Sequence, residues 1–471
     1  MFPGKDAKST KTTWLPAMGR ALAHRNFRLL AIGQGISVVG TWMQQIATVW
    51  LVYRLSHSSF LLGLADFSSQ IPAALVLPLV GVLADRWNRR RTVLATQTLM
   101  MIQAFALMAL TLSGTVNVWH ILVLGVLLGL VNAFDCTARQ TLVIQMVERH
   151  DDLGNAIAIN SSMFNAARLL GPAVAGFIIG MCGEWPCFLL NGLSYLAVLG
   201  SLLAMRVRSA PRPVSQPGIF QGLTEGFGYV AGSMPIRTLL VLLGVMSMMS
   251  APLTVLMPLL ATDVLHGGAN TLGLLTAALG IGALAASLLL AARKSVLGLG
   301  RVIAVATGAF GLGLAGLSLS HTLGVSLALL VGIGFAMVTQ MAASNAVLQT
   351  IVEEGKRGRV MSFYTMAFFG MGPLGSLLSG CLAGTIGVAA TILVCGLVCV
   401  AASLVFAGVL PRLKRAMRPI YIQVGILPGA CDLLPEPAAA KQVRPEESPA
   451  DSRPLRVPTW PSEEPARRSA A

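Results

Sequence analysis

Charged side chains are scarce in this sequence. Only 11% of its 471 residues are Asp, Glu, Lys or Arg, and 55% are hydrophobic. A soluble domain usually carries about 25% charged residues, so most of this chain lacks the side chains that a water-facing surface needs. The composition therefore indicates a protein that lies mainly within a lipid bilayer.

Motifs for enzymatic chemistry are also missing. The sequence has no Walker motif and no nucleophile triad, and His57, His266 and His321 have no paired ligands nearby for a metal. We therefore expect no enzymatic activity, no catalytic residue, no cofactor and no metal. The seven cysteines form no regular framework, although Cys182 and Cys187 flank an expected outer turn and could pair.

Long apolar runs follow one another along the chain. About 20 apolar residues in a helix span a hydrocarbon core of about 30 Å, and a helix satisfies its own backbone polar groups in lipid. The runs predict an all-α membrane protein with twelve transmembrane helices. The expected spans are 29–53, 60–84, 92–113, 118–138, 155–181, 186–205, 237–262, 270–292, 302–320, 322–346, 360–384 and 386–410. The first run is too long for a signal peptide and contains Gln34, Gln44 and Gln45.

The spans divide into two halves. Residues 29–205 and 237–410 each hold six spans, and the Pro- and Arg-containing segment 206–236 is the expected hinge. Residues 1–28 form a basic N-terminal segment, and residues 411–471 form a tail that is basic at first and then rich in Pro, Glu and Ala. The end of that tail cannot bury a core, so we expect it to be disordered.

Basic residues alternate between the two sides of the expected bundle. One side receives the N-terminal cluster, the loops near Arg89, Arg149 and Arg293, the hinge and the Arg412–Arg418 cluster, whereas the other receives little beyond Arg54. Lys and Arg mark cytoplasmic loops, so both termini are expected in the cytoplasm. The net charge of +15 then reflects orientation in the membrane, and we do not expect nucleic-acid binding.

The sharpest motif lies between the second and third spans. The sequence Gly81-Val-Leu-Ala-Asp85-Arg86-Trp-Asn-Arg89-Arg90-Arg91 joins a glycine, a carboxylate and an arginine run at the edge of the membrane. Orientation alone requires only the arginines. The glycine lets the helix end approach a neighbour closely, and the acidic residue at this spacing indicates a functional loop.

The pattern G-x-x-x-D-R-x-x-R-R resembles the signature loop of the major facilitator superfamily, and the resemblance covers about residues 25–415. In members of that superfamily the loop aspartate contacts helix eleven and gates the exchange between inward- and outward-open states. The resemblance implies this role for Asp85, with Arg86, Arg89 and Arg90 as its partners. It also implies two pseudo-symmetric six-helix halves, which fits the corresponding Gly-Pro pairs of the two halves.

Within the superfamily, the chain resembles the bacterial branch that contains the enterobactin exporter and transmembrane secretion effectors. The motifs that carry this resemblance are Asp135-x-x-Ala138-Arg139-Gln140, Asn155-Ala-Ile-Ala-Ile-Asn160-Ser161, Phe164-Asn165-x-Ala167-Arg168-x-x-Gly171-Pro172-Ala173 and Phe188-Leu-x-Asn191. The resemblance implies export across the bacterial inner (plasma) membrane.

Two charged residues lie inside expected spans of the first half. Arg168 follows Asn155 by 13 residues, which is about 20 Å along a helix. An arginine deep in the bilayer costs about 2.5–3.5 kcal/mol on insertion scales. It either holds helices together or faces a central cavity, where it would bind an anionic substrate or tune a proton site. Asp66 lies a turn or two from the outer surface and is the candidate for proton coupling, unless the helix begins later and leaves it in a loop.

Asp135 and Arg139 are four residues apart near the cytoplasmic end of the fourth span. This spacing places both side chains on one helix face. They form either a local surface pair or, with Arg139 reaching Asp85, part of a gating network.

Two expected helices contain an internal Gly-Pro pair. The motif Gly171-Pro172-x-x-x-Gly176 in the fifth span resembles the helix-five motif of drug/proton antiporters, and Gly372 and Pro373 mirror it in the eleventh span. An internal proline removes a helix hydrogen bond and bends the helix, and glycines allow close packing. The antiporter motif has further glycines where this chain has Ala167 and Ala175, so a plain packing kink explains the pair equally well.

These observations predict a secondary active transporter that exports a small amphipathic organic molecule, such as a siderophore or an antibiotic, by proton-driven alternating access. Its partners would be the lipid bilayer, the exported molecule and protons, and a monomer is the simplest expectation. A lipid or lysophospholipid flippase on the same scaffold is the alternative. A non-transporting membrane sensor is a remote one, because the sequence offers no folded soluble domain.

Overall fold

The computed structural model describes residues 20–86, 88–146, 150–205, 219–293, 295–423 and 426. Residues 1–420 group into one unit and residues 421–471 into another. The described part of the chain is helical and contains no strand, which confirms the all-α expectation.

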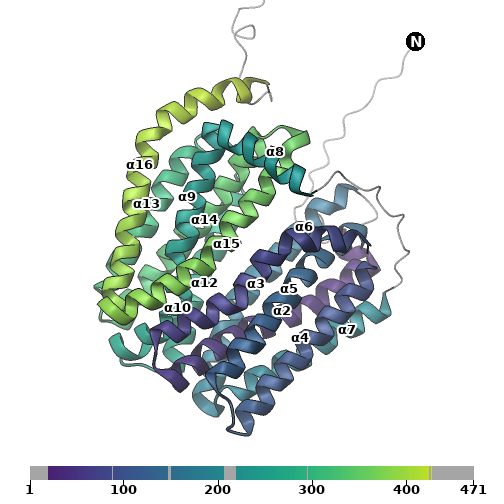
Figure 1. Cartoon of the computed structure of the whole chain (residues 1–471), viewed down its shortest axis with the longest axis vertical. Helices are drawn as coiled ribbons and strands as arrows, with labels where there is room; N and C mark the ends of the chain where they lie inside the picture. Colours follow the sequence, from purple (N-terminus) through teal and green to yellow (C-terminus); the bar gives the residue numbers. More distant parts are fainter. Residues whose placement is uncertain are drawn as a thin grey trace, which may run out of the picture. The chain divides into compact units, whose positions relative to one another are not determined.

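The first half consists of six long helices that follow a short 3₁₀ turn, η1 (Arg20–Ala23). They are α2 (Arg25–Ser56), α3 (Ser59–Arg86), α4 (Arg89–Leu112), α5 (Val118–Met146), α6 (His150–Cys182) and α7 (Trp185–Ala204). Each of these helices corresponds to one expected span (Figure 1).

The second half also follows the expected order. Its elements are α9 (Met234–Ser250), α10 (Pro252–Val255), α11 (Met257–Leu259), η2 (Leu260–Val264), α12 (Ala269–Ala291), α13 (Leu299–Ser318), α14 (Leu323–Ile351), α15 (Glu354–Ile386) and α16 (Val388–Gln423). The seventh span is broken into α9, α10, α11 and η2 instead of being one helix. Pro252 and Pro258 lie at these breaks, because proline lacks the N–H that a continuous helix needs.

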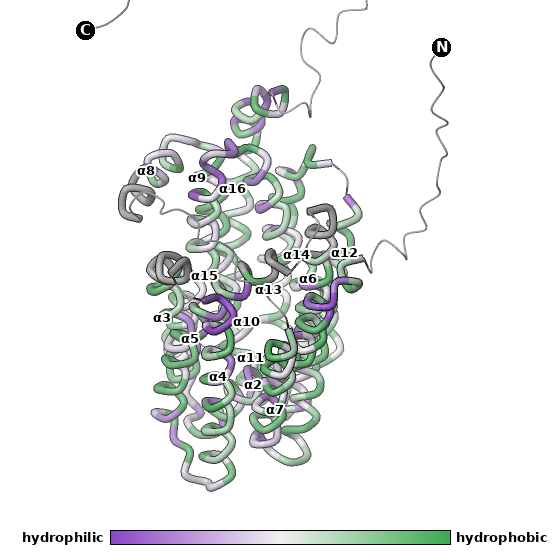
Figure 2. Tube along the Cα trace, turned by 90° about the vertical axis from the view of Figure 1, so that its right-hand side faces the viewer, coloured by the Kyte–Doolittle hydropathy of each residue, from purple (hydrophilic) through white to green (hydrophobic). Residues whose placement is uncertain are grey.

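Eleven helices of the described chain are long and apolar enough to cross a membrane. The helix α2 is not among these eleven. It has 32 residues and is long enough to cross a membrane, so it is excluded because its sequence is less apolar. It contains the glutamines Gln34, Gln44 and Gln45, and two of these are buried within the bundle. Figure 2 shows hydrophobic residues along most of each long helix.

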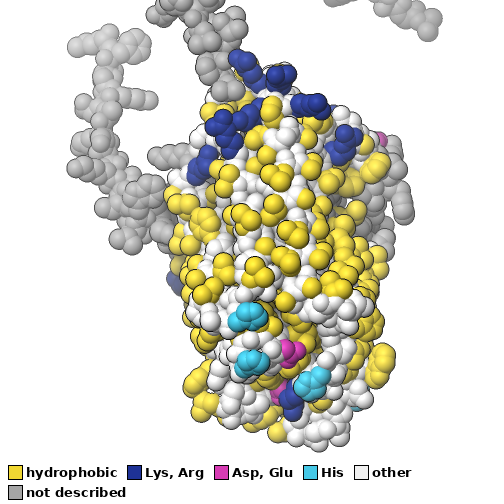
Figure 3. Space-filling view, turned by 90° about the vertical axis from the view of Figure 1, so that its left-hand side faces the viewer, with side chains coloured by type: hydrophobic (Ala, Val, Ile, Leu, Met, Phe, Trp, Pro, Cys, Tyr) yellow, Lys and Arg dark blue, Asp and Glu magenta, His cyan; other side chains and the backbone are white. Residues whose placement is uncertain are grey.

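The surface separates into an apolar middle and two polar ends. Large apolar side chains such as Leu312 (64% exposed) and Val405 (68% exposed) cover the sides of the helices, as lipid-facing residues do. Figure 3 shows Lys and Arg gathered at one end, and His, Asp and Glu near the other. We call the first the arginine-rich end, because it contains the start of α2 and the exposed Arg293, Arg301 and Arg412.

The hinge contains a helix, α8 (Ile219–Gly232). Its Glu225 carboxylate accepts a hydrogen bond from Arg359 of α15 at 2.6 Å, and its Tyr229 ring lies 4.4 Å from the Lys356 ammonium. Phe227 of α8 and Phe363 of α15 are also in ring contact, with centroids 6.4 Å apart. The helix α8 is therefore held against the first turns of α15.

The hydrophobic core is shared unequally between the halves. One large buried cluster combines both halves, with Leu51 and Phe188 from the first and Leu256 and Phe310 from the second. A second cluster lies toward the arginine-rich end and contains Phe27, Leu142 and other residues of the first half only. The two halves are thus packed together mainly away from the arginine-rich end.

Candidate functional site

The signature loop, residues 81–91, joins α3 to α4. Gly81, Asp85 and Arg86 are helical in α3, but their side-chain contacts lie outside the described part of the structure. Asn88 caps α4 by accepting a hydrogen bond from the Arg91 N–H, which is the usual role of Asn at that position.

Arg90 is bonded to the end of α7. Its guanidinium donates to the carbonyl oxygens of Leu202 (2.9 Å) and Leu203 (3.2 Å). These carbonyls lie in the last turn of α7, where helical partners are missing and a cation is favoured. Arg90 therefore anchors the signature loop to α7. The expected pairing of Asp85 with Arg86, Arg89 and Arg90 stays a prediction.

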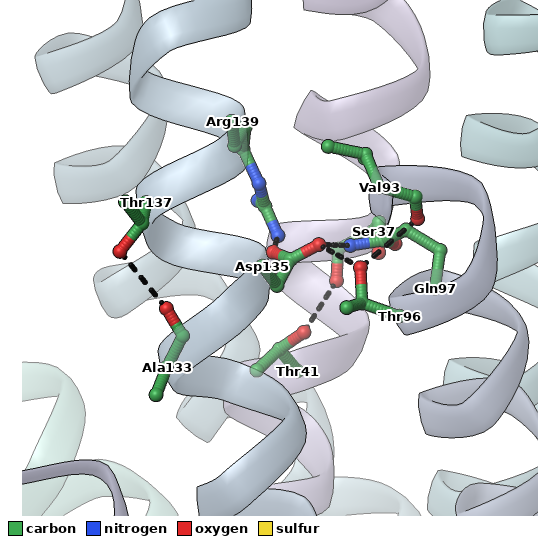
Figure 4. A network of polar contacts seen from close by, with 9 residues as sticks. All are labelled: Ser37, Thr41, Val93, Thr96, Gln97, Ala133, Asp135, Thr137 and Arg139. Carbon is green, nitrogen blue, oxygen red and sulfur yellow. Dashed lines mark hydrogen bonds and ion pairs between the residues drawn. The ribbon is translucent and has the colours of Figure 1, made fainter. Parts of the chain in front are cut away.

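Asp135 and Arg139 form an ion pair along α5 (Figure 4). Asp135 is completely buried, and its Oδ1 also accepts hydrogen bonds from Thr96 and Gln97 of α4, each at 2.8 Å. A surface pair is therefore the wrong interpretation. The pair is an internal junction between α4 and α5, because a buried carboxylate requires several polar partners.

A second buried network, which the sequence analysis missed, joins α2, α4 and α7. Gln44 donates to the Gln103 carbonyl oxygen at 2.8 Å and accepts from the Asn191 amide at 2.7 Å. All three side chains are buried. The only sequence signal was the presence of glutamines inside an apolar span, because polar residues there normally face the bundle interior.

Asp66 lies at the contact between the two halves. Its Oδ2 accepts hydrogen bonds from Ser376 of α15 at 2.5 Å and from Gln70, one turn further along α3, at 2.6 Å. Asp66 is helical and two turns into α3, so the loop alternative is excluded. Among the described residues, Asp66 is the one acidic side chain of α3 or α15 that is hydrogen-bonded to the other half at this contact.

Two glycines bring α3 and α15 together beside Asp66. A Cβ on Gly63 would lie 2.4 Å from the Ser376 carbonyl oxygen and 3.1 Å from the Cα of Gly380. The Ser59 hydroxyl donates to the Gly380 carbonyl oxygen at 3.0 Å. We call this contact, from Ser59 to Asp66 on α3 and from Ser376 to Gly380 on α15, the seam.

The face of α15 that forms the seam changes from buried to exposed along the helix. Ser376 and Gly380 are buried against α3, whereas Met366 (58% exposed) and Phe369 (55% exposed) lie on the same face nearer the arginine-rich end. Successive members of this set are three, seven and four residues apart along α15, so they share one side of the helix. The halves therefore separate beyond Asp66 in the direction of the arginine-rich end.

A parallel contact joins α6 to α12. A Cβ on Gly176 would lie 2.8 Å from the Cα of Gly273, and the Asn165 amide donates to the Ser287 hydroxyl at 3.4 Å. Pro172 lies inside α6 and Pro373 inside α15, as expected. Both prolines are buried, and a Cβ on Gly273 of α12 would lie 2.8 Å from the Pro172 carbonyl oxygen.

The ends of the helices opposite the arginine-rich end carry another polar connection that the sequence analysis missed. The Tyr53 hydroxyl of α2 donates to the Asp263 carboxylate at 3.0 Å and accepts from Thr262 at 2.7 Å. Arg54 pairs with Glu184 at 2.8 Å. The Tyr53–Asp263 hydrogen bond is thus a third contact between the halves, in addition to the seam and the α6–α12 contact.

Arg168 lies near the middle of α6 beside two aromatic rings. Its guanidinium carbon is 5.7 Å from the centroid of the Trp42 ring, and Phe164 meets Trp42 edge to face at 5.7 Å. Gly171 makes room for this arrangement, because a Cβ there would lie 2.4 Å from the Trp42 Cβ. Within the described residues, no carboxylate pairs with Arg168, so the ion-pair explanation for this arginine is not supported.

Cysteines and metal ligands add no site to the described chain. Cys182 and Cys187 are both free thiols, so the disulfide considered from the sequence is not formed. No group of three His, Cys, Asp or Glu side chains in the described ranges is arranged to hold a metal.

Known proteins with similar sequences are membrane transporters. The model of the transmembrane secretion effector family matches residues 16–421. The staphyloferrin A transporter of Staphylococcus aureus is 25% identical over 80% of this chain and 94% of its own length. The multidrug efflux pump Tap of Mycolicibacterium fortuitum is 26% identical, covering 81% and 93%. The enterobactin exporter EntS of Citrobacter koseri is 26% identical, covering 87% and 97%.

Solved structures share the fold. The nucleoside transporter NupG superposes with a TM-score of 0.66 at 15% identity, over 81% of this chain and 98% of NupG. A bacterial homologue of the human lysosomal transporter Spinster, in an inward-facing and occupied conformation, gives 0.64 at 15% identity, over 84% and 98%.

Proposed function

Because this chain belongs to the transmembrane secretion effector family of the major facilitator superfamily, we propose that it exports a small amphipathic organic molecule, such as a siderophore or an antibiotic. The chain is a multi-pass membrane protein. Relatives that match most of its length are named for a siderophore or for drug efflux. A lipid flippase is not favoured by these relatives.

The observation that carries the proposed mechanism is the asymmetry of the contact between the halves. The seam, the α6–α12 contact and the Tyr53–Asp263 hydrogen bond join the halves, whereas the same face of α15 is exposed at Met366 and Phe369. In alternating access, one end of the bundle is closed while the other admits the substrate. The arrangement supports a state that is open toward the arginine-rich end.

Protons are the proposed energy source. Moving one elementary charge across 100 mV supplies about 2.3 kcal/mol. Asp66 is suited to carry the proton because its carboxylate bonds to Ser376 of the other half. A proton on Asp66 would change that hydrogen bond and so couple protonation to opening of the seam.

The proposed orientation places the arginine-rich end and both termini in the cytoplasm, and the protein in the inner membrane of a bacterium. A cysteine introduced at Arg89 tests this orientation. It should react with a membrane-impermeant thiol reagent in everted vesicles and stay unlabelled in intact cells. Labelling from outside the cell would overturn the proposed orientation.

Transport by everted vesicles tests the proposed function. With an imposed pH gradient, vesicles containing the protein should accumulate a siderophore or a fluorescent dye, and dissipating the gradient with a protonophore should stop accumulation. Proteoliposomes that flip labelled lipid, and vesicles that accumulate neither a siderophore nor a dye, would instead support the flippase. Competition between unlabelled compounds then ranks the candidate substrates.

A further inference from the structure

Among the described residues, no anionic side chain pairs with the Arg168 guanidinium in the interior of the bundle. It lies 18 residues from the start of α6 and 14 from its end. Among the described side chains, the Trp42 ring at 5.7 Å is its one hydrogen-bond, ion-pair or cation–π partner. An arginine at this depth normally has a partner, because desolvating an unpaired charge is costly. The available partner position is therefore suited to a bound anion.

The position of Arg168 on α6 directs it away from lipid. Exposed apolar side chains form one stripe along the helix, with Leu170 (52% exposed), Val174 (41%), Phe177 (63%) and Met181 (69%) at helical spacing. This spacing marks the lipid-facing side. Arg168 comes two residues before Leu170, which is about 200° around the helix, so it lies on the side facing the other helices.

The aromatic partners of Arg168 share this interior side. Phe164 is one turn from Arg168 on α6, is 50% exposed, and meets Trp42 edge to face. On α2, the exposed apolar residues Ile32 and Ile36 face away from the exposed polar residues Thr41 and Gln45. Trp42 comes three residues before Gln45 and so lies about 60° from it around the helix. When a polar side chain is exposed within a membrane span, it normally faces a water-filled space and not lipid.

We propose that Trp42, Phe164 and Arg168 form a binding subsite for a flat aromatic ring that carries an acidic group. The guanidinium offers up to five N–H donors in a planar fork that matches a carboxylate or a pair of phenolate oxygens. The Trp42 face and the exposed Phe164 ring accept an aromatic ring edge to face or stacked, and the guanidinium lies 5.7 Å from the centroid of the Trp42 ring, within cation–π distance. This inference rests on the proposed function, because it assigns the substrate class of the exporter.

Four probes that vary ring and charge separately test the subsite. They are 2-naphthoate, its fully saturated analogue decahydronaphthalene-2-carboxylate, the neutral 2-naphthalenemethanol and the cationic 2-naphthylmethylammonium. Titration calorimetry with the purified full-length protein in nanodiscs should give an affinity for 2-naphthoate about tenfold above that of either the saturated acid or the neutral alcohol. The cationic probe should bind least.

Variants should remove the two preferences separately. Arg168→Gln should abolish the preference for the acid over the alcohol, and Trp42→Leu the preference for the aromatic over the saturated acid. Arg168→Lys, which keeps the charge and a similar volume, should retain part of the acid preference even if Arg168→Gln fails to fold. Phe177→Leu, on the lipid stripe of the same helix, is the matched control and should change neither.

The outcomes separate the subsite from the proposed function. Equal binding of the four probes, or an unchanged affinity of Arg168→Gln and Arg168→Lys for 2-naphthoate, would overturn the subsite, even where everted vesicles still export a dye. Binding with the expected dependence on both variants would establish the subsite, even where no pH-driven transport is found and the proposed function fails.

Discussion

The Ser376 hydroxyl donates a 2.5 Å hydrogen bond to the Asp66 carboxylate, and the two residues are 310 positions apart in the sequence. This bond joins α3 of the first half to α15 of the second. It lies at the end of the seam, beyond which the same face of α15 is exposed at Met366 and Phe369. Protonation of a titratable group at this position can be coupled to the separation of the two halves. Variants of Asp66 and of the residues around it should therefore change transport in predictable ways.

Replacing Asp66 should uncouple transport from protons. Asp66→Asn keeps the shape and the hydrogen bonds but cannot exchange a proton. We expect the pH-driven accumulation of dye in everted vesicles to fall to background, while gradient-independent exchange of dye persists. Ser376→Ala, which leaves the carboxylate in place, should cause only a partial loss. Full pH-driven transport by Asp66→Asn would exclude Asp66 as the proton carrier.

The signature loop provides a second expectation. Asp85→Asn should abolish transport in everted vesicles while the protein remains in the membrane, because the change removes the charge proposed to gate the cytoplasmic side. Arg91→Gln, in the same loop, is the control and should retain transport. Unchanged efflux by Asp85→Asn would count against the gating role.

The buried pair on α5 should contribute to stability rather than to coupling. Asp135→Ala leaves Arg139 without its carboxylate and Thr96 and Gln97 without their acceptor. Breaking a buried pair by removing one partner costs about 3–5 kcal/mol. The thermal unfolding temperature of the detergent-purified protein should therefore fall, and the double variant Asp135→Ala/Arg139→Leu should recover part of it. An unchanged unfolding temperature for Asp135→Ala would contradict the buried junction.

The glycine crossing at the seam should be sensitive to a single methyl group. In Gly63→Ala the added Cβ would meet backbone atoms of α15, which cannot rotate away. We expect the seam to open, so that a cysteine introduced at the buried Leu62 reacts faster with a membrane-impermeant thiol reagent in intact cells, with the exposed native cysteines replaced by serine.

The matched control for this variant is Gly332→Ala in α14. An added Cβ at Gly332 would meet no atom within 4 Å, so labelling should keep its original rate. Equal labelling rates in Gly63→Ala and Gly332→Ala would argue against close packing at the seam.

The contact between α8 and α15 should be weak. Glu225 and Arg359 are 48% and 39% exposed, and ion pairs on exposed surfaces contribute about 0.2–1 kcal/mol. Glu225→Gln should therefore shift the unfolding temperature very little, and raising the salt concentration should remove the difference between variant and parent. A large destabilisation would mean that α8 is a structural element of the bundle.

The positions of the long helices could be predicted closely. The expected spans 92–113 and 186–205 became α4 (Arg89–Leu112) and α7 (Trp185–Ala204), because the thickness of a bilayer and the need to satisfy the backbone act on each segment separately. The break in the seventh span was missed although Pro252 and Pro258 were visible. A proline can lie inside a continuous helix, as in α6 and α15, or end it, and the surrounding packing decides which occurs.

The candidate site was only partly predictable. The sequence identified Arg168 and Asp66 as charges inside spans, since any charge in an apolar run stands out. It did not identify Trp42 or Ser376, because an aromatic ring or a hydroxyl in a span is ordinary until a neighbouring helix is known. The burial of Asp135 was missed for the same reason, as its partners Thr96 and Gln97 are on α4.

The sequence by itself determined that this chain is helical, crosses the membrane many times and carries its basic residues at one end, because hydrophobicity, length and charge act locally along the chain. Only the tertiary structure decided that Asp66 meets Ser376, that Arg168 faces Trp42 and that α15 is buried at one end and exposed at the other. Those relationships depend on the register at which distant helices pack, and register is set by the fit of side chains from both partners, which neither segment encodes alone.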